Sequence, residues 1–192
     1  MRLRPFRKTW IRRNDKRRHA EAVLWCWDTK KREMSDLSTV INWRRRDNLT
    51  TLSGQPTEAQ FAQFKTSGVT HVINLGPHTN KGALKNQTGC LADLGLKYTY
   101  IPVDFENPTQ ANFNAFCAAL AQSQNDTIHV HCIYNARVSA FYYRYALEGL
   151  GGEVQLAFEL MDSIWRPGGV WAQFIGKPQD ADLPIRYAGY DY

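Results

Sequence analysis

The residues best suited to chemistry in this chain lie in the stretch HVHCIYNARVSAF, residues 129–141. A β-branched run ends at Cys132, a short loop follows, and a helical pattern begins near Arg137. A thiol there faces the free N–H groups and positive dipole of a helix N-terminus, which together with the guanidinium favour thiolate over thiol. The same groups can hold a tetrahedral oxyanion. The stretch therefore predicts a nucleophilic cysteine in an anion-binding loop; a cysteine that merely packs at a strand end is the plainer alternative.

The residues that follow the cysteine would shape this site. Asn135 tolerates a left-handed backbone, which a tight loop can require. The Ser139 hydroxyl either stabilises the cysteine thiolate by a hydrogen bond or caps the helix. We expect the contacts with a substrate to come from Ile133, Tyr134, Asn135, Ala136, Val138 and Ser139.

A general acid is expected from a different loop. Asp104 stands at the carboxyl end of the strand pattern YTYIPVD, where a loop could bring it over the cysteine. Glu106, in the same DFENP segment, is the alternative donor, and an ordinary loop carboxylate is the plainer interpretation of both. His129 and His131 share one strand face, but no third ligand follows at a metal-binding spacing. We therefore interpret them as hydrogen-bonded structural histidines and expect neither a metal nor another cofactor.

Short apolar runs alternate with helical periods from about residue 48 onward. This alternation predicts an α/β fold with a three-layer arrangement: a mainly parallel central sheet of about four to five strands, flanked by helices. The carboxyl ends of the strands would gather the loops after Gly76, around Asp104 and at Cys132. The expected strands are 49–54, 71–76, 98–104 and 127–132, and the expected helices are 57–68, 81–94, 109–120, 137–145, 154–165 and 168–176.

The positive charge of the chain is concentrated at its N-terminus. Residues 1–33 hold 12 of the 24 Lys and Arg but only 4 of the 18 Asp and Glu, so the remainder is slightly acidic. We expect residues 1–47 to be a basic, disordered leader, 48–176 to be the α/β domain and 177–192 to be an irregular tail. The alternative with a function is that residues 1–33 form an arm that binds nucleic acid or an anionic membrane. A segment that is not natively translated, with Met34 as the start, is another.

The cysteines and the apolar runs bear on the compartment. Cys26, Cys90, Cys117 and Cys132 are irregularly spaced with no CxxC pair, which argues against a disulfide framework and a structural zinc site. No apolar run approaches the roughly 18 residues of a spanning helix, and none has the length expected of a signal peptide. These features favour a soluble protein in a reducing compartment, the cytoplasm. The oligomeric state is not fixed by the sequence.

Four motifs in this order resemble a known bacterial family. They are LSGQPTEAQF, GVTHVINLGP, GLKYTYIPVDFENPT and VHCIYNARVSAF, and they span roughly residues 48–176. The set is similar to the bacterial dual-specificity and tyrosine-phosphatase-like proteins once called a domain of unknown function, which are related to the N-terminal part of beta-lactamase-hydrolase-like proteins. The resemblance implies a phosphatase in which Cys132 attacks phosphorus, Arg137 binds the equatorial oxygens and an Asp protonates the leaving oxygen. It also implies that His131 supports the loop and that Gln55 lines the same end of the sheet, where Gln55 either contacts the substrate or closes a turn.

One departure from the general phosphatase pattern keeps other functions open. That pattern has five residues between Cys and Arg, with a Gly among them and Ser or Thr directly after the Arg. Here only four residues lie between Cys132 and Arg137, Val138 follows, and the hydroxyl is displaced to Ser139. The shorter spacing resembles rhodanese-type sulfurtransferases, which carry a persulfide on the cysteine. The hypotheses are thus a phosphate-monoester hydrolase, a sulfurtransferase, and a non-catalytic module that binds phosphorylated ligands or small oxyanions.

Overall fold

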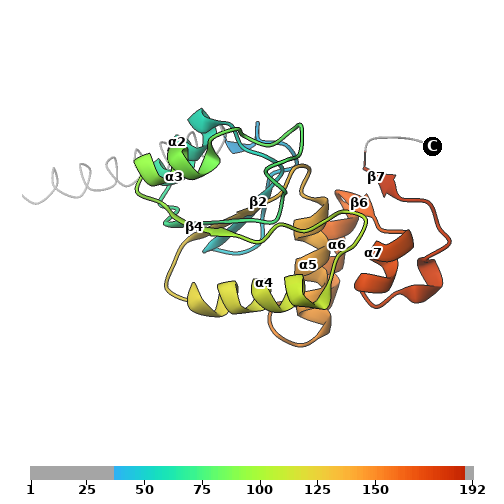
Figure 1. The fold of residues 1–192 in the computed structure, drawn as a ribbon. Coiled ribbons are helices and arrows are strands. Elements are labelled where there is room, and N and C mark those ends of the chain that lie inside the picture. The colour runs from blue at the N-terminus through green and yellow to red at the C-terminus, as the bar shows by residue number, and fades with distance from the viewer. Residues whose placement is uncertain (1–36, 189–192) are drawn as a thin grey trace, which may run out of the picture. The chain divides into compact units, whose positions relative to one another are not determined.

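A computed structural model describes residues 37–188 of the chain, and its centre is a five-stranded sheet (Figure 1). The strand order is β1-β2-β5-β3-β4. β2, β5, β3 and β4 are parallel, and only β1 runs antiparallel to its neighbour β2. The mainly parallel α/β sheet predicted from the sequence is therefore confirmed. The strands are β1 (Arg44–Arg45), β2 (Thr50–Ser53), β3 (His71–Asn74), β4 (Lys97–Tyr100) and β5 (Ile128–His131).

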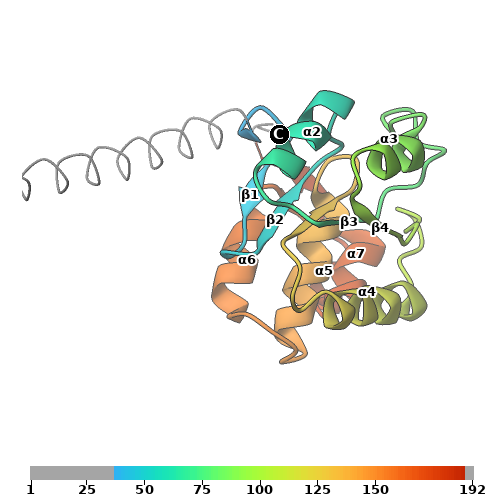
Figure 2. The same ribbon diagram turned by 90° about the vertical axis from the view of Figure 1, so that its left-hand side faces the viewer.

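Helices cover both faces of this sheet (Figures 1 and 2). Helices α2 and α3 lie on one face, where Val72 of β3 packs in a cluster with Phe61, Phe64 and Leu91. Helices α4 and α5 lie on the other face, where the next residue, Ile73, joins the larger cluster. Adjacent strand residues point to opposite faces, which explains the two clusters. The helices are α2 (Glu58–Thr66), α3 (Gln87–Asp93), α4 (Gln110–Gln122), α5 (Ala136–Leu147), α6 (Val154–Asp162) and α7 (Gly169–Phe174).

The predicted leader boundary at residue 47 is wrong for residues 37–47. Leu37 and Val40 are 3% and 2% exposed and belong to the core cluster under α2 and α3. Arg44 and Arg45 then form β1, paired with Leu52 and Thr51. The segment 37–47 holds four apolar residues, Leu37, Val40, Ile41 and Trp43, and a run this short does not distinguish a buried segment from a leader. The basic segment 1–33 lies outside the described residues.

The expected irregular tail also contains ordered structure. A 3-10 turn, η1 (Pro178–Asp180), is followed by β7 (Arg186–Tyr187), which pairs with β6 (Trp165–Arg166) in a second, two-stranded sheet. The helix predicted to reach Trp165 therefore ends earlier, at Asp162. The strand predicted to reach Asp104 ends at Tyr100, two residues before a proline that has no N–H for a sheet bond. Among the described residues, no helix combines the length and apolarity needed to cross a bilayer.

Candidate active site

Cys132 lies at the carboxyl end of the central strand β5, between the ends of its two neighbours. Its N–H donates to the Ser53 carbonyl of β2 at 3.3 Å, and the His131 carbonyl accepts from Leu75 N–H, just beyond β3, at 2.8 Å. The residue is fully buried. The sheet thus fixes the backbone on both sides of the thiol, in the position that the sequence predicts for the nucleophile.

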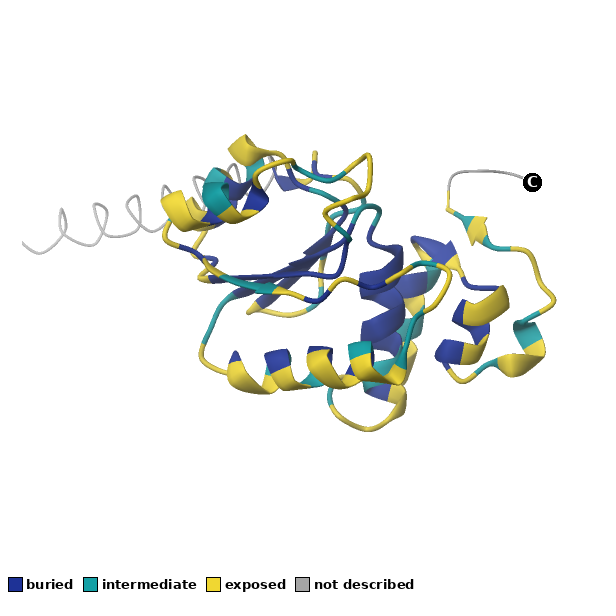
Figure 3. Ribbon diagram, viewed as in Figure 1, coloured by how far each residue is buried: buried dark blue, intermediate teal, exposed yellow. Residues whose placement is uncertain are grey.

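The backbone turns sharply between Cys132 and helix α5. Asn135 has φ 69° and ψ 0°, the left-handed conformation that the sequence allowed for it. The first bond of the helix runs from Ser139 N–H to the Asn135 carbonyl at 3.0 Å. The N–H groups of Ala136, Arg137 and Val138 come before that bond and have no acceptor within the helix. Asn135 does not cap them with its side chain, so this buried helix start (Figure 3) offers three donors to an anion.

Arg137 is a buried cation that has no acidic partner in the part of the chain from 37 to 188. It is 7% exposed, and its Nε is buried with no hydrogen-bond acceptor among the described residues. Its guanidinium carbon instead lies 5.0 Å from the centre of the Phe105 ring, a cation–π contact. Burial of an uncompensated charge is costly, so a side chain placed in this way is suited to an anionic ligand.

The contact with Phe105 brings the segment of Asp104 next to Arg137. Val103 N–H donates to the Leu75 carbonyl at 3.2 Å, which holds this segment beside the end of β3. The Phe105 carbonyl accepts from Trp171 Nε1 at 2.7 Å. The Asp104 side chain is exposed, and its Oδ1 accepts from Glu106 N–H at 3.0 Å. The candidate acid therefore stands on a loop anchored at the same end of the sheet as Cys132.

His131 connects the cysteine backbone to two glutamines. Its Nδ1 lies 3.2 Å from the Cys132 carbonyl and its Nε2 lies 2.7 Å from Gln87 Nε2. Gln87 can only donate there, so Nε2 accepts and Nδ1–H donates to the carbonyl. Burial lowers the pKa of His131 to about 4, which keeps the ring neutral. Gln55 Nε2 donates to Gln87 Oε1 at 3.0 Å, so the predicted substrate contact is tied into this network.

His129 and Ser139 have partners inside the core. The ring of His129 lies 2.9 Å from Thr51 Oγ1 and 3.0 Å from Ser53 Oγ, and burial holds its pKa well below the ordinary value. Within residues 37–188, no three His, Cys, Asp or Glu side chains gather where they could hold a metal ion. Ser139 Oγ donates to the Ala136 carbonyl at 3.0 Å and accepts from Trp165 Nε1 at 3.1 Å. The Ser139 hydroxyl is thus bonded within the core in this structure, and its predicted hydrogen bond to the thiolate stays a prediction.

The loop residues predicted to contact substrate divide by exposure. Ile133 and Tyr134 are partly exposed, whereas Asn135, Ala136 and Val138 are buried. Tyr134 also meets Tyr187 of β7 edge-to-face, with ring centres 5.4 Å apart. The sequence analysis missed this contact, because a two-residue strand leaves no periodic signal. It also missed Asn42 and Gln87, which bond to the loop and to His131 from distant parts of the chain.

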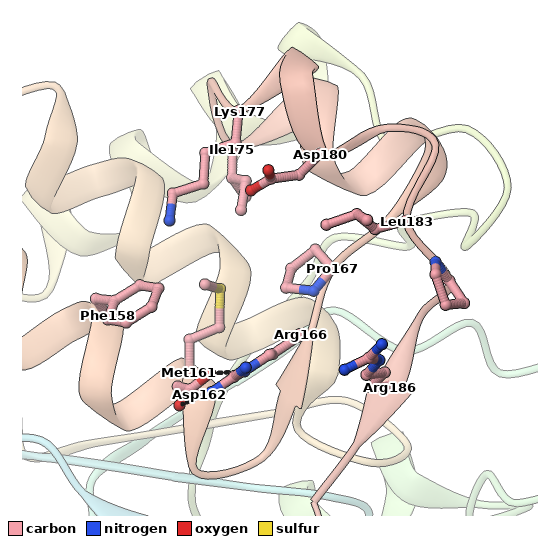
Figure 4. A pocket seen from close by; sticks show the side chains of 11 residues that line it. Phe158, Met161, Asp162, Arg166, Pro167, Ile175, Lys177, Asp180, Leu183 and Arg186 are labelled. Carbon is pink, nitrogen blue, oxygen red and sulfur yellow. Dashed lines mark hydrogen bonds and ion pairs between the residues drawn. The ribbon is translucent and has the colours of Figure 1, made fainter. Parts of the chain in front are cut away.

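A separate hollow of about 330 Å³ lies among α6, β6, η1 and β7 (Figure 4). Its lining combines apolar Phe158 and Met161 with charged Lys177, Asp180 and Arg186. It includes none of the residues from Cys132 to Arg137. The cysteine loop and this hollow are therefore different features of the surface.

Comparison with known proteins places the chain in a class and then in a family. No family model matches the sequence. A sheet with a cysteine–arginine loop at its carboxyl edge is the architecture of the cysteine-phosphatase-like proteins. A crystal structure from Shewanella putrefaciens CN-32, named "Putative phosphatase (DUF442)", is 31% identical, with a TM-score of 0.66 over 75% of this chain and 95% of that one. The chain belongs to this DUF442 family, as the four motifs predicted.

Other relatives agree with this placement. Two Xylella fastidiosa strains carry a "Beta-lactamase hydrolase-like protein" that is 33% identical over 97 residues; the match covers 47% of this chain but only 22% of the relative. The catalytic core of the PP-IP phosphatase SIW14 from S. cerevisiae, in complex with citrate, has a TM-score of 0.56 at 13% identity, covering 76% and 96% of the chains. The structure of P. aeruginosa TpbA in complex with pTyr has a TM-score of 0.52 at 18% sequence identity. The match covers 64% of this chain and 72% of that one. At such identities the likeness concerns the fold alone.

Proposed function

We propose that the protein is a phosphatase of the protein-tyrosine or dual-specificity type that hydrolyses phosphate monoesters through Cys132. The observation that carries this proposal is the buried guanidinium of Arg137, which has no hydrogen-bond partner within residues 37–188, at the start of the helix that follows the cysteine loop, beside three amides that have no acceptor within that helix. The family relative named as a phosphatase, and the neighbours that bind pTyr or citrate, support an oxyanion as the ligand.

The proposed reaction has two steps. The Cys132 thiolate attacks phosphorus, an S–P bond forms, the ester P–O bond breaks, and Asp104 gives a proton to the departing oxygen. Water then attacks the cysteinyl phosphate, Asp104 takes a proton from it, and the S–P bond breaks to release phosphate and restore the thiolate. Arg137 and the amides hold the equatorial oxygens throughout, so that the developing charge meets fixed donors.

Hydrolysis of p-nitrophenyl phosphate tests the proposal. We expect Cys132→Ser to abolish the activity, with Cys117→Ser, a half-buried thiol on α4, as the matched control. Loss of a general acid lowers kcat on the order of 10²-fold or more. We therefore expect Asp104→Asn to have that effect and Glu106→Gln to have little. Full activity in Cys132→Ser would refute the proposal. A larger loss of kcat in Glu106→Gln than in Asp104→Asn would make Glu106 the general acid.

The four-residue spacing between Cys132 and Arg137 keeps a sulfurtransferase as the second candidate. That function would appear as thiocyanate formation from thiosulfate and cyanide, lost in Cys132→Ser. Mass spectrometry of the isolated protein would then find one extra sulfur on Cys132. A protein that shows neither activity but melts at a higher temperature in phosphate would be a non-catalytic oxyanion-binding module.

A further inference from the structure

A segment far upstream of the cysteine is bonded directly to its loop. Asn42 Nδ2 donates to the Tyr134 carbonyl at 3.0 Å, and Asn135 Nδ2 donates to the Asn42 carbonyl at 2.7 Å. The segment at Asn42 and the loop residues Tyr134 and Asn135 therefore exchange a pair of hydrogen bonds across 92 and 93 residues of sequence. Asn42, which the sequence analysis assigned to the leader, is in this way part of the wall of the site.

Gly54 fills the space between the same two segments. Its N–H donates to the Ile41 carbonyl at 2.7 Å, and the next N–H, of Gln55, donates to the Ile133 carbonyl at 3.1 Å. A Cβ on Gly54 would lie 2.7 Å from the Ile133 oxygen and 2.9 Å from Ile41 Cβ. Only glycine allows this approach, so the upstream segment, the end of β2 and the cysteine loop form one bonded stack.

Both asparagines adopt a left-handed backbone, with φ 48° at Asn42 and 69° at Asn135. Such conformations are unfavourable for residues with a side chain and persist where surrounding bonds impose them. The exchanged pair supplies those bonds here. The bond to Asn42 holds the Asn135 amide nitrogen, while Asn135 Oδ1 is buried with no hydrogen-bond partner among the described residues and makes no capping bond to α5. The N–H groups at the start of α5 are thereby left for a ligand.

We propose that Asn42 is a positioning residue, which holds the turn at Asn135 so that the amides of α5 and Arg137 face the bound oxyanion. The inference rests on the proposed function in one respect only, namely that an oxyanion binds at this loop. Asn42 does not touch the substrate; it acts through Tyr134 and Asn135. The segment before β1 therefore helps to position the cysteine loop, although it makes no contact with the substrate.

The test uses glycine, which keeps the left-handed backbone and removes only the side chain. Asn42→Gly and Asn135→Gly are compared in the full chain with Asn125→Gly, an exposed asparagine remote in sequence from the loop. Orthovanadate affinity and hydrogen exchange of the amides 133–138 are measured for each. Loss of one buried hydrogen bond predicts weaker vanadate binding on the order of 10-fold in both loop variants, and no change in the control. We also expect faster exchange at 133–138 in both.

A merely structural role for Asn42 would give a different result. The melting temperature of Asn42→Gly would fall, while its vanadate affinity and the exchange of amides 133–138 would match the wild type, and this would overturn the inference. Failure of the proposed function is a separate outcome. It would appear as hydrolysis of p-nitrophenyl phosphate that is as fast in Cys132→Ser as in the wild type. If wild-type protein bound no vanadate at all, the premise of an oxyanion site would be false and the inference would fall with it.

Discussion

At the scale of single residues, the site depends on a contrast between Arg137 and His131. Both are buried, but burial lowers the pKa of His131 to about 4 and so keeps it neutral, although its bond to the Cys132 carbonyl acts in the opposite direction. Arg137 cannot lose its charge in this way, because a guanidinium stays protonated in proteins. The positive charge at the start of α5 is therefore permanent, and an anion is its natural complement.

The reactivity of the three described thiols should reflect this contrast. Burial raises the pKa of the Cys90 and Cys117 thiols, so both are poor nucleophiles at mildly acidic pH. We expect iodoacetate at that pH to modify Cys132 first, because the amides at the start of α5 and the Arg137 guanidinium attract the anionic reagent to its loop. Peptide mass spectrometry over time measures the three rates. Phosphate should slow the reaction at Cys132 only, and equal rates at all three sites would contradict an activated thiolate.

At the scale of elements, the loop after β5 depends on the close approach of three segments. Gly54→Ala would place a Cβ against a backbone oxygen and a β-branched side chain, neither of which can move easily. We expect a loss of about 1–3 kcal/mol in the free energy of unfolding, measured by urea denaturation. Gly82→Ala is the matched control, because its Cβ would meet one side-chain atom at 3.0 Å, Cγ2 of the same Ile133, and no non-neighbouring backbone atom of the described residues within 4 Å. An equal loss of unfolding free energy in both variants would show that the contact with the Ile133 backbone oxygen does not matter more than the side-chain contact.

The segment before β1 should contribute to stability as a core element. Leu37 is 3% exposed, and its truncation in Leu37→Ala would leave a cavity beside α2 and α3. We expect this variant to lose about 2–5 kcal/mol of unfolding free energy. Leu49→Ala, at a leucine that is 51% exposed, should lose far less. Equal effects would instead support the leader boundary at residue 47.

The elements also show what the sequence could and could not predict. Strands β2, β3 and β5 and helices α2, α4 and α5 were predicted because each has a period or a capping pattern, such as Thr57 and Gln60 at the start of α2. Strands β1, β6 and β7 have two residues each and show no period. Within the site, the placement of Cys132 and the turn at Asn135 followed from local chemistry. Asn42 and Gln87 did not, because a polar residue gives no sign of a partner many residues away.

At the scale of the whole molecule, the central sheet buries two neutral histidines, His129 and His131, on one face. The pKa of His131 is about 4 in the folded protein against 6.5 ordinarily, and that of His129 is also well below 6.5. Between these values the unfolded chain binds more protons than the folded one, so stability falls as the pH falls. Above pH 6.5 both states are neutral at these rings, and they make no contribution to the pH dependence.

We expect the free energy of unfolding to fall by at most about 1.4 kcal/mol per pH unit for each of these rings as the solution is acidified below their ordinary pKa. Urea denaturation at a series of pH values measures the slope. His131→Gln keeps a polar side chain of similar size. The slope of its unfolding free energy against pH should be smaller by the contribution of one bound proton. A stability that stays level from neutral pH down to pH 5 would contradict the buried neutral state.

The central claim is that Cys132 carries the phosphoryl group during turnover. The direct measurement is mass spectrometry of protein quenched in acid while it hydrolyses p-nitrophenyl phosphate, with Asp104→Asn included to test whether a weakened second step makes the intermediate accumulate. We predict one added phosphoryl group on the peptide that contains Cys132, absent in Cys132→Ser. Hydrolysis that proceeds with no phosphoryl group on that peptide, or with the group on another residue, would contradict the account.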